Sequence, residues 1–534
     1  MSADLRSDAA RSVHRIARHG ALERDVGADV VGFKAFNLAR MAELGLNVPP
    51  AFVIGTGFCA VPAEATVAVW HDHLAWLESA TGLAFNDPRK PLLLSVRSGA
   101  PVSMPGMMET LLNIGLSDHT LAGIIRTSGN PRLAWDAYRR LVAAFGEVVA
   151  GVDAAAFEAD LAAVAGDQAD RDLDHLALRE LARRHLATYR REAGAPFPQD
   201  PYEQLDRAIA AVFGSWSSAR ASSYRTMRGL PDTLGTAVTV QQMVFGNAGG
   251  LSGAGVGFTR DPTDGTPAPW VDFLFNAQGE DVVSGRRNAG SGEILGAVAP
   301  GVWNDLVAAT RALEIAFRDM QDFEFTVQDG RLFLLQTRNG KRTPQAAARI
   351  ALDMAEEGLI DRQTALRRTG DLTPEGLAVT RLGGGAEAAT PIATAASASA
   401  GAVSGRIALD EAASLRLAQG GEAVILVRRD AETSDIAALD HAAGLLTQNG
   451  SRTSHAAVVA RQLGKVCLVG CGALSIDEPA RSIAIAGWSF PEGAELTIDG
   501  NDGRIYRGRL AIERVPPAGL WERLQALRNE TDAG

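Results

Sequence analysis

Two spacings of apolar residues alternate along the chain, and together they predict a mixed α/β protein. Residues 31–45 begin with a glycine turn and continue with apolar side chains at helical spacing, which predicts an amphipathic helix. Short apolar runs at 52–54 and Leu92–Ser98, and a β-branched run at 237–245, predict buried strands. From about 118 to 225 the spacing is helical. We expect that stretch to form a helical subdomain inserted into an α/β domain.

A β-hairpin is predicted between Asp322 and Arg338. Its first strand alternates strictly between polar and apolar side chains, and Gln328-Asp329-Gly330 supplies the turn. A three-residue loop with Gly330 left-handed sorts the side chains into two faces. The polar face would carry Asp322, Glu324, Gln336 and Arg338, and the apolar face Phe323, Phe325, Phe333 and Leu335. A two-residue Asp-Gly turn would move Gln336 to the apolar face.

Glycine-rich stretches predict loops and a domain boundary. Leu251–Asp261 leads into a turn at Asp261-Pro262, and its glycines predict a lid-like loop or a simple turn. Residues 344–380 have a helical pattern. The stretch 383–405 is rich in Gly, Ala, Ser and Thr, which predicts a flexible connection. From 405 to 511, short strands and helices alternate.

One histidine follows an apolar run, a glycine turn and several hydroxyl residues within Gly444–Gly464. Thr453 or Ser454 would cap the helix that follows, and Gly464 would end it. His455 would then lie in the first helical turn, where free N–H groups and the helix dipole disfavour imidazolium and favour an anion. Because neutral imidazole is a nucleophile, the position suits a phosphohistidine. A capping histidine in an ordinary strand–turn–helix unit is the alternative.

Composition narrows the class of protein. A chain of 534 residues is too long to fold around a single hydrophobic core, and this length suggests three or four domains. A net charge of −11 argues against a nucleic-acid or anionic-membrane binder. Three cysteines are too few for a disulfide framework and indicate a reducing compartment. No apolar run could span a bilayer and the start has no apolar signal core, so we expect a cytoplasmic protein.

Candidate phosphate and metal ligands occur without a Gly-x-x-x-x-Gly-Lys-Ser/Thr loop. Lys34 follows a glycine turn where its ammonium could approach a phosphate. Arg97 ends an apolar strand, where a guanidinium is costly to bury without an anion. The hairpin carboxylates and amide suit Mg²⁺, and Arg338 could brace a phosphate. A solvated lysine and a solvated sheet face with a salt bridge are the ordinary alternatives.

Several motifs, in order, resemble the pyruvate, phosphate dikinase family over nearly the whole chain. They are Lys34–Met41 with Gly45–Pro50, Ser95–Ala100 with Ser103–Thr110, Gln242–Asn247, Asn276–Val283, Leu335–Arg342 and Thr453–Arg461. Two departures stand out. The family usually has Gly-Gly-Lys-Gly in place of Gly32-Phe33-Lys34-Ala35, and Gly-Gly-Met in place of Gly450-Ser451-Arg452. The loss of two glycines around Lys34 could narrow the turn that would bind phosphate. Arg452 adds a cation near His455, which could help to bind phosphate or could change the partner of the protein.

The resemblance implies an α/β multidomain architecture. Its expected parts are an N-terminal tail (1–25), an ATP-grasp nucleotide-binding domain (26–340) with the helical subdomain at 118–225, a helical connector and flexible linker (341–400), a swivelling β/β/α phosphohistidine domain (401–511) and a C-terminal tail (512–534). Residues 383–405 would be the hinge region.

The resemblance also implies roles for individual residues. The expected ATP-binding residues are Lys34, Arg97, Gln242, Met243, Val244, Glu280, Asp322, Glu324, Gln336 and Arg338. Of these, Glu324 and Gln336 would also hold Mg²⁺. His455 would carry the phosphoryl group. Thr453 matches a position that is regulated by phosphorylation in some family members.

The implied reaction is the first half of a dikinase: ATP and phosphate react with His455 to give phosphohistidine, AMP and pyrophosphate. Family members continue into a TIM barrel that binds pyruvate and phosphoenolpyruvate, whereas this chain ends just past the histidine domain. We therefore expect a separate barrel protein as partner, and no nucleic acid or membrane. The alternatives are a phosphoenolpyruvate synthase-like or other small-molecule phosphotransferase, a non-catalytic phosphocarrier or regulator, and a truncated gene product.

Overall fold

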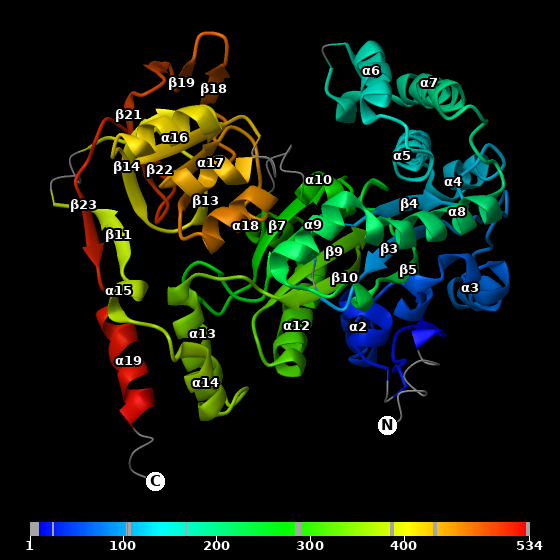
Figure 1. The fold of residues 1–534 in the computed structure, drawn as a ribbon, viewed down its shortest axis with the longest axis horizontal. Helices are drawn as coiled ribbons and strands as arrows, with labels where there is room; N and C mark the ends of the chain where they lie inside the picture. Colours follow the sequence, from blue (N-terminus) through cyan, green and yellow to red (C-terminus); the bar gives the residue numbers. More distant parts are fainter. Residues whose placement is uncertain are drawn as a thin grey trace. The chain divides into compact units, whose positions relative to one another are not determined.

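The computed structural model describes residues 10–23, 26–102, 104, 108–166, 168–283, 290–384, 389–430 and 435–529. These residues form two compact units. The first comprises the chain up to Gly250 together with 333–337, and the second comprises Leu251–Leu332 and the chain from Arg338 onward. Each unit combines sheets with helices, which confirms the mixed α/β class (Figure 1). The predicted domain over 26–340 extends across this division, so its boundaries stay a prediction.

The described part of the first unit contains an antiparallel five-stranded sheet in the order β1-β2-β5-β3-β4. Its strands are β1 (Val13–Ile16), β2 (Ala51–Ile54), β3 (Leu94–Gly99), β4 (Thr110–Ile114) and β5 (Ala237–Gln242). The strands predicted near 52, 92 and 237 are thus neighbours in one sheet. The predicted tail over 1–25 is wrong for Val13–Ile16, because this segment pairs with β2 through backbone hydrogen bonds that its sequence does not reveal.

Helices accompany this sheet in the described part of the first unit. They are α2 (Ala28–Glu43), α3 (Val67–Thr81), α4 (Leu121–Ser128), α5 (Pro131–Ala150), α6 (Ala154–Ala165), α7 (His175–Ala193), α8 (Pro201–Gly214) and α9 (Ala219–Arg228). The helices α4 to α9 lie between β4 and β5 in the chain, which confirms the helical pattern predicted from about 118 to 225. Phe145 of α5 and Leu205 of α8 share a core with Phe52 and Val96 of the sheet.

The second unit begins with strands of a sheet ordered β10-β9-β6-β7-β8. They are β6 (Gly253–Phe258), β7 (Trp270–Phe275), β8 (Gly290–Ser291), β9 (Gln321–Gln328) and β10 (Arg331–Asn339), accompanied by α10 (Gly279–Val283), α11 (Gly292–Val298) and α12 (Pro300–Phe317). Val256 of β6 lies opposite Asp272 of β7 on one side and Glu324 of β9 on the other. Directly paired residues share a face of a sheet, so these three side chains lie on one face.

Gly253, Gly255 and Gly257 belong to the buried strand β6, so the predicted lid-like loop is wrong. A Cβ on Gly255 would lie 2.4 Å from Cζ of Phe325, and a Cβ on Gly257 would lie 2.9 Å from Cζ of Phe323. The bare glycine backbone therefore makes room for aromatic rings from the neighbouring strand. These glycines therefore allow the aromatic rings to pack against the strand, and they do not form a turn.

The strands β9 and β10 form the predicted hairpin with a different turn. Asp329 and Gly330 alone separate the two strands, and both have positive φ, 50° and 75°. Two left-handed residues in a two-residue loop are typical of a type I′ turn. The predicted three-residue loop is wrong because the short polar side chain of Asp329 also tolerates the left-handed region.

The C-terminal part of the second unit contains an eight-stranded sheet in the order β12-β22-β21-β14-β15-β16-β17-β13. Its strands are β12 (Ala393–Thr394), β13 (Ala396–Ser399), β14 (Ala402–Ala408), β15 (Val424–Arg428), β16 (Gly444–Thr447), β17 (Val466–Val469), β21 (Glu495–Asp499) and β22 (Arg504–Arg507). The strands β14 to β17 are parallel in sequence order. Their apolar side chains form two separate cores, one on each face.

Each of these cores is closed by a different layer. One contains side chains of the helices α16 (Glu411–Gln419), α17 (Ile436–His441) and α18 (His455–Gln462). The other contains side chains of a small antiparallel sheet made of β18 (Leu474–Asp477), β19 (Ser482–Ile485) and β20 (Trp488–Pro491). The layers are therefore sheet, sheet and helices.

The flexible connection predicted over 383–405 is wrong for most of its described part. Ala396–Ser399 pairs with β17, and the strand that starts at Ala402 pairs with β15 and β21. Ala398 is fully buried. Backbone hydrogen bonds hold these strands, and small side chains allow them to pack closely. Residues 385–388 of the predicted hinge lie outside the described residues.

Helices and a two-stranded ribbon precede and follow the eight-stranded sheet in the chain (Figure 1). They are α13 (Pro344–Glu356), α14 (Arg362–Thr369), α15 (Pro374–Leu377) and α19 (Ala518–Asn529), with β11 (Val379–Leu382) paired to β23 (Ile512–Val515). Leu524 of α19 packs with Ala348 and Leu352 of α13, so the predicted C-terminal tail is ordered structure up to Asn529. Among the described residues, no helix has the length and apolar content needed to cross a membrane.

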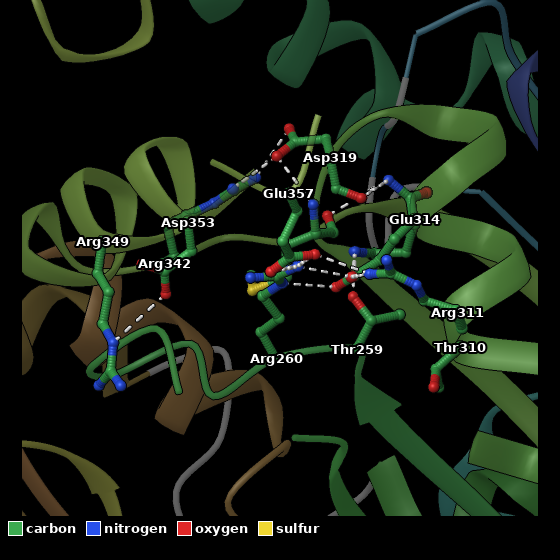
Figure 2. Close-up of polar contacts among 12 residues, drawn as sticks. Thr259, Arg260, Thr310, Arg311, Glu314, Asp319, Arg342, Arg349, Asp353 and Glu357 are labelled. Atoms are coloured by element: carbon green, nitrogen blue, oxygen red, sulfur yellow. Dashed lines mark hydrogen bonds and ion pairs between the residues drawn. The ribbon is translucent and has the colours of Figure 1, made fainter. Parts of the chain in front are cut away.

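Buried ion pairs connect the end of β6 to α12 and the end of α13 (Figure 2). The guanidinium of Arg260, 1% exposed, donates to both carboxylate oxygens of Glu314 at 2.9 and 3.0 Å. It also donates to both oxygens of Glu357 at 2.9 and 3.0 Å, and Arg311 binds Glu357 at 2.8 Å. A charge this deeply buried depends on its partners, because its own desolvation is costly.

Candidate active site

The histidine segment connects the parallel strand β16 to α18, which begins at His455. Ser454 occupies the N-cap position, but its side chain makes no capping hydrogen bond, so the predicted hydroxyl cap is wrong there. Gly464 follows the helix with φ 66°, the left-handed conformation expected of a terminating glycine. The backbone of His455 therefore lies where the first N–H groups of a helix have no helical partner. Its side chain lies outside the described residues.

Residues 451–454, which we call the docking turn, contact strand β7. Nε of Arg452 lies 2.9 Å from Oδ1 of Asp272, and the backbone N–H and hydroxyl of Thr453 donate to Oδ2 at 3.0 and 3.1 Å. Nη2 of Arg452 donates to the carbonyl of Val271 at 2.8 Å, and its guanidinium lies 4.1 Å from the centre of the Trp270 ring. Asp272 is 2% exposed. The cation that the sequence places beside the histidine is therefore neutralised by a buried carboxylate.

Two further side chains attach this segment. The hydroxyl of Ser451 donates to the carbonyl of Val282 at 3.1 Å. Arg461, 2% exposed, donates to the carbonyls of Ala398 at 2.8 Å and Arg452 at 3.0 Å. Burial lowers the pKa of Arg461 to about 10. Its hydrogen bond to Arg452 fixes the backbone of the docking turn.

The docking turn lies against the sheet face that carries predicted ATP-binding carboxylates. Val256 separates Asp272 from Glu324 on that face, and Asp322 is two residues before Glu324 on β9. Since neighbouring strands are about 4.8 Å apart, the backbones of Asp272 and Glu324 are about 10 Å apart. The segment that presents His455 is thus attached within two strand spacings of Glu324.

Asp322 and Arg338 meet as predicted, with Nε of Arg338 at 2.8 Å from Oδ2 of Asp322. Burial raises the pKa of Asp322, and the guanidinium opposes this shift. Burial works against the charge of Arg338 as well, but Asp322 and Glu324 outweigh it and raise its pKa. Both charges are withdrawn from water, and each is stabilised by the other.

In the first unit, Gly32 brings Lys34 to the end of β3. Gly32 interrupts α2 with φ 76°, and the N–H of Phe33 donates to the carbonyl of Ala100 at 2.9 Å. As a result Lys34 and Arg97 line one small cavity. The structure therefore brings these two predicted phosphate ligands together.

Sequence reasoning missed other residues of this cavity, which is also lined by Thr239, Gln241 and Leu335. Thr239 lies opposite Arg97 on the neighbouring strand. The alternation of Val238 and Val240 with Thr239 and Gln241 could have revealed a polar face of β5. Leu335, which the sequence assigned to the apolar face of the hairpin, also lines this cavity. Asp272 was missed too, although a carboxylate inside the apolar run of β7 signals a buried partner.

The other predicted site residues have different surroundings. Gln242, Met243 and Val244 leave the end of β5 half-buried, and the N–H of Met243 donates to the carbonyl of Leu93 at 2.9 Å. The backbone of Glu280 lies in α10, but its side chain lies outside the described residues, as do residues 103 and 105–107 of one motif and 284–289.

A cation would find oxygen donors on the hairpin. Glu324 is half-buried on β9 and Gln336 is buried on β10. Across the described ranges, no three His, Cys, Asp or Glu side chains gather as a closed metal site. The carboxylate of Glu324 is the kind of hard oxygen donor that Mg²⁺ prefers. The two-residue turn would place Gln336 on the other face of the hairpin, so a shared metal role for these two residues stays a prediction.

Two family models match the chain. The model of the AMP/ATP-binding domain of pyruvate phosphate dikinase matches residues 71–292 and 303–359, and the model of the mobile domain of PEP-utilising enzymes matches 420–503. The second match includes the docking turn and α18. The fold and these matches define a protein that joins a nucleotide-binding domain to a mobile domain.

Similar full-length proteins identify the family. The chain is 42% identical over 501 residues to pyruvate, phosphate dikinase 2 of Zea mays, covering 92% of this chain and 56% of that protein. It is 40% identical over 511 residues to pyruvate, phosphate dikinase of Clostridium symbiosum, covering 93% and 58%. The chain belongs to the pyruvate, phosphate dikinase family. It spans little more than half the length of these relatives.

Proposed function

We propose that this protein is a dikinase-type phosphotransferase that moves the β-phosphoryl group of ATP to His455. The γ-phosphoryl group passes to inorganic phosphate and leaves as pyrophosphate, and AMP is the other product. The single observation that best supports this proposal is the attachment of the docking turn to Asp272, on the same sheet face as Glu324. This attachment brings the start of α18 to a face with carboxylates suited to a metal–phosphate complex.

The proposed roles follow the chemistry of each side chain. Lys34 and Arg97 hold phosphate oxygens, while Gln242, Met243 and Val244 border the adenine. Glu324 and Gln336 hold Mg²⁺, which would neutralise charge on the phosphates when bound. Glu280, Asp322 and Arg338 complete the phosphate-binding set. The proposed ATP-grasp arrangement needs no Gly-x-x-x-x-Gly-Lys loop. Catalysis would rest on positioning and charge neutralisation.

The names of the relatives suggest pyruvate as the onward acceptor, and we propose that this second step uses a pyruvate-binding barrel on a separate protein. The phosphohistidine domain would swivel between the two sites. A carrier or regulator that binds ATP without turnover is the second candidate. It is favoured by the neutralised Arg452 and by Phe33 and Ala35, which replace the glycines usual in the family.

The proposal is tested by incubating the protein with Mg²⁺, phosphate and ATP labelled at the β or the γ position. We expect acid-labile β label on the protein and γ label in pyrophosphate. His455→Ala should abolish the labelling, while His441→Ala, a change at an exposed histidine of the same C-terminal region, should retain it. Stable γ label would contradict the dikinase reaction. ATP binding without any label would favour the carrier. Pyruvate is then added to the labelled protein. Loss of the label from the protein would show that this chain alone can transfer the phosphoryl group to pyruvate.

A further inference from the structure

We propose that Arg452 is a positioning residue for phosphoryl transfer, because its ion pair with Asp272 holds the docking turn on strand β7. This inference rests on the proposed function. It goes beyond that function by assigning a role to the position where the chain departs from the Gly-Gly-Met pattern usual in its family.

The ion pair is largely withdrawn from water. The side chain of Arg452 is 20% exposed and that of Asp272 is 2% exposed. The guanidinium is held on three sides, by the Asp272 carboxylate, the Val271 carbonyl and the Trp270 ring. Charge-assisted hydrogen bonds in such surroundings are stronger than exposed ion pairs, which contribute little.

The Asp272 carboxylate is dedicated to this contact. Within the described part of the chain, its side-chain hydrogen bonds all go to Arg452 and Thr453. If the docking turn left strand β7, the carboxylate would lose all of these donors at once. The contact therefore stabilises the docked arrangement, because undocking would leave a buried carboxylate without its partners.

Both unusual residues of the turn contribute contacts that the common family residues could not make. Ser451 uses its hydroxyl on the Val282 carbonyl, and a glycine has no such group. Arg452 donates to both Asp272 and Val271, and a methionine has no donor. Arg461 adds a third attachment, since its guanidinium lies 5.0 Å from the Trp270 ring centre and 5.4 Å from that of Phe258. The departures from the family pattern thus strengthen one contact surface.

The functional consequence is a shift in the docked population. A tighter contact keeps His455 at the nucleotide-binding face for a larger fraction of the time, which raises the rate of the first half-reaction. The same contact must break before the histidine can reach another acceptor. Arg452 would therefore favour phosphorylation of His455 over its discharge.

The test compares Arg452→Met, Asp272→Asn and the double variant with the natural chain. Hydrogen exchange is measured without nucleotide in peptides covering 270–275 and 449–463, which include the Thr453 N–H bonded to Asp272. We expect each single variant to speed exchange there by about tenfold or more, and the double variant to add little to either. Arg416→Met removes an exposed arginine that pairs with Glu492, and as the matched control it should change nothing in these peptides.

Kinetics separate positioning from folding. Arg452→Met should slow β-label transfer about tenfold at saturating ATP and leave the KM for ATP unchanged. Exchange in the first-unit strands β2 and β5 should stay as in the natural chain, which excludes general unfolding. Unchanged exchange in Arg452→Met, or fully additive effects in the double variant, would overturn the proposal. If the natural chain transfers no label, the exchange experiment still decides the docking contact, so failure of the proposed function is distinguished from failure of this inference.

Discussion

Gly32 at the start of α2 lies directly against Gly99 at the end of β3, so closely that a Cβ on Gly32 would be 1.8 Å from the Gly99 carbonyl oxygen. The approach also uses the positive φ of Gly32, 76°. Since Lys34 follows two residues later, this contact helps to bring Lys34 to the cavity that it lines together with Arg97. The glycine retained in Gly32-Phe33-Lys34-Ala35 is therefore the one on which the geometry of the turn depends.

Gly32→Ala is expected to lower the free energy of unfolding by about 3 kcal/mol or more, through a left-handed alanine costing about 1–2 kcal/mol and a backbone clash. ATP affinity should fall with it, because Lys34 moves. Urea unfolding and calorimetric titration with ATP check both effects. Gly82→Ala is the matched control, since Gly82 has φ 66° and no atom within 4 Å of its Cβ position. Equal losses in both variants would mean that the Gly99 contact is unimportant.

Arg260→Met should lower the free energy of unfolding by about 3–5 kcal/mol, because Glu314 would remain buried without its main partner. Adding Glu314→Met should recover part of that loss by removing the unpaired charge. Thermal and urea unfolding measure the effect. Arg481→Met, at a solvent-exposed arginine paired with Asp410 and Glu492, should destabilise the protein far less. A double variant as unstable as the sum of the single changes would contradict the expected coupling.

Asp136 in α5 predicts a pH dependence of stability. Burial works against its charge, but Arg139 at 2.7 Å and Arg140 at 3.1 Å outweigh it and lower its pKa below the ordinary 3.8. Its stabilising contribution is therefore fully present above the unfolded pKa and is lost as pH falls through the folded pKa. Asp136→Asn should be less stable than the natural chain by about 3 kcal/mol at pH 7, because it leaves two arginines without their carboxylate.

Urea unfolding at several pH values checks this sign. The difference between Asp136→Asn and the natural chain should be constant from pH 7 to about pH 5 and should narrow below about pH 4. Glu203→Gln, at an exposed pair with Arg207, is the control and should show little difference at any of these pH values. A difference that widens on acidification would be inconsistent with a lowered pKa.

Thr453→Asp should undock the turn. The hydroxyl of Thr453 lies 3.1 Å from Oδ2 of Asp272, so a new carboxylate there would repel a buried one. Two like charges at about 4 Å repel by about 4 kcal/mol near a protein surface, which predicts a loss of first-half labelling on the order of tenfold or more. Thr453→Ser keeps the hydroxyl and should retain labelling. Normal labelling in Thr453→Asp would show that the hydroxyl contact is dispensable.

Much of the local structure could be predicted because it depends on neighbouring residues. The spacing of apolar side chains located the helices after residue 118 and the strands at 52–54 and 237–245. Strict alternation located the hairpin. Asp322 meets Arg338 as predicted, although the three-residue loop used to pair them is wrong. The placement of His455 at a helix start followed from the strand, turn and helix signals within twenty residues.

The errors occurred where the meaning of a residue depends on a distant partner. Gly255 lies in a glycine-rich stretch that is typical of a loop. In the structure it belongs to strand β6, where its missing side chain makes room for the Phe325 ring. The small residues of 396–399 have the composition of a linker, but β17 supplies the hydrogen bonds that make them a strand.

By itself, the sequence determined the family, the mixed α/β class and the position of His455 at the start of a helix. These depend on local periodicity, turn chemistry and ordered motifs. Only the tertiary structure decided the partners of the docking turn, since Arg452 and Asp272 are 180 positions apart and neither residue specifies the other. The physical reason is that a buried charge requires a counter-charge in space, while its position along the chain is left open.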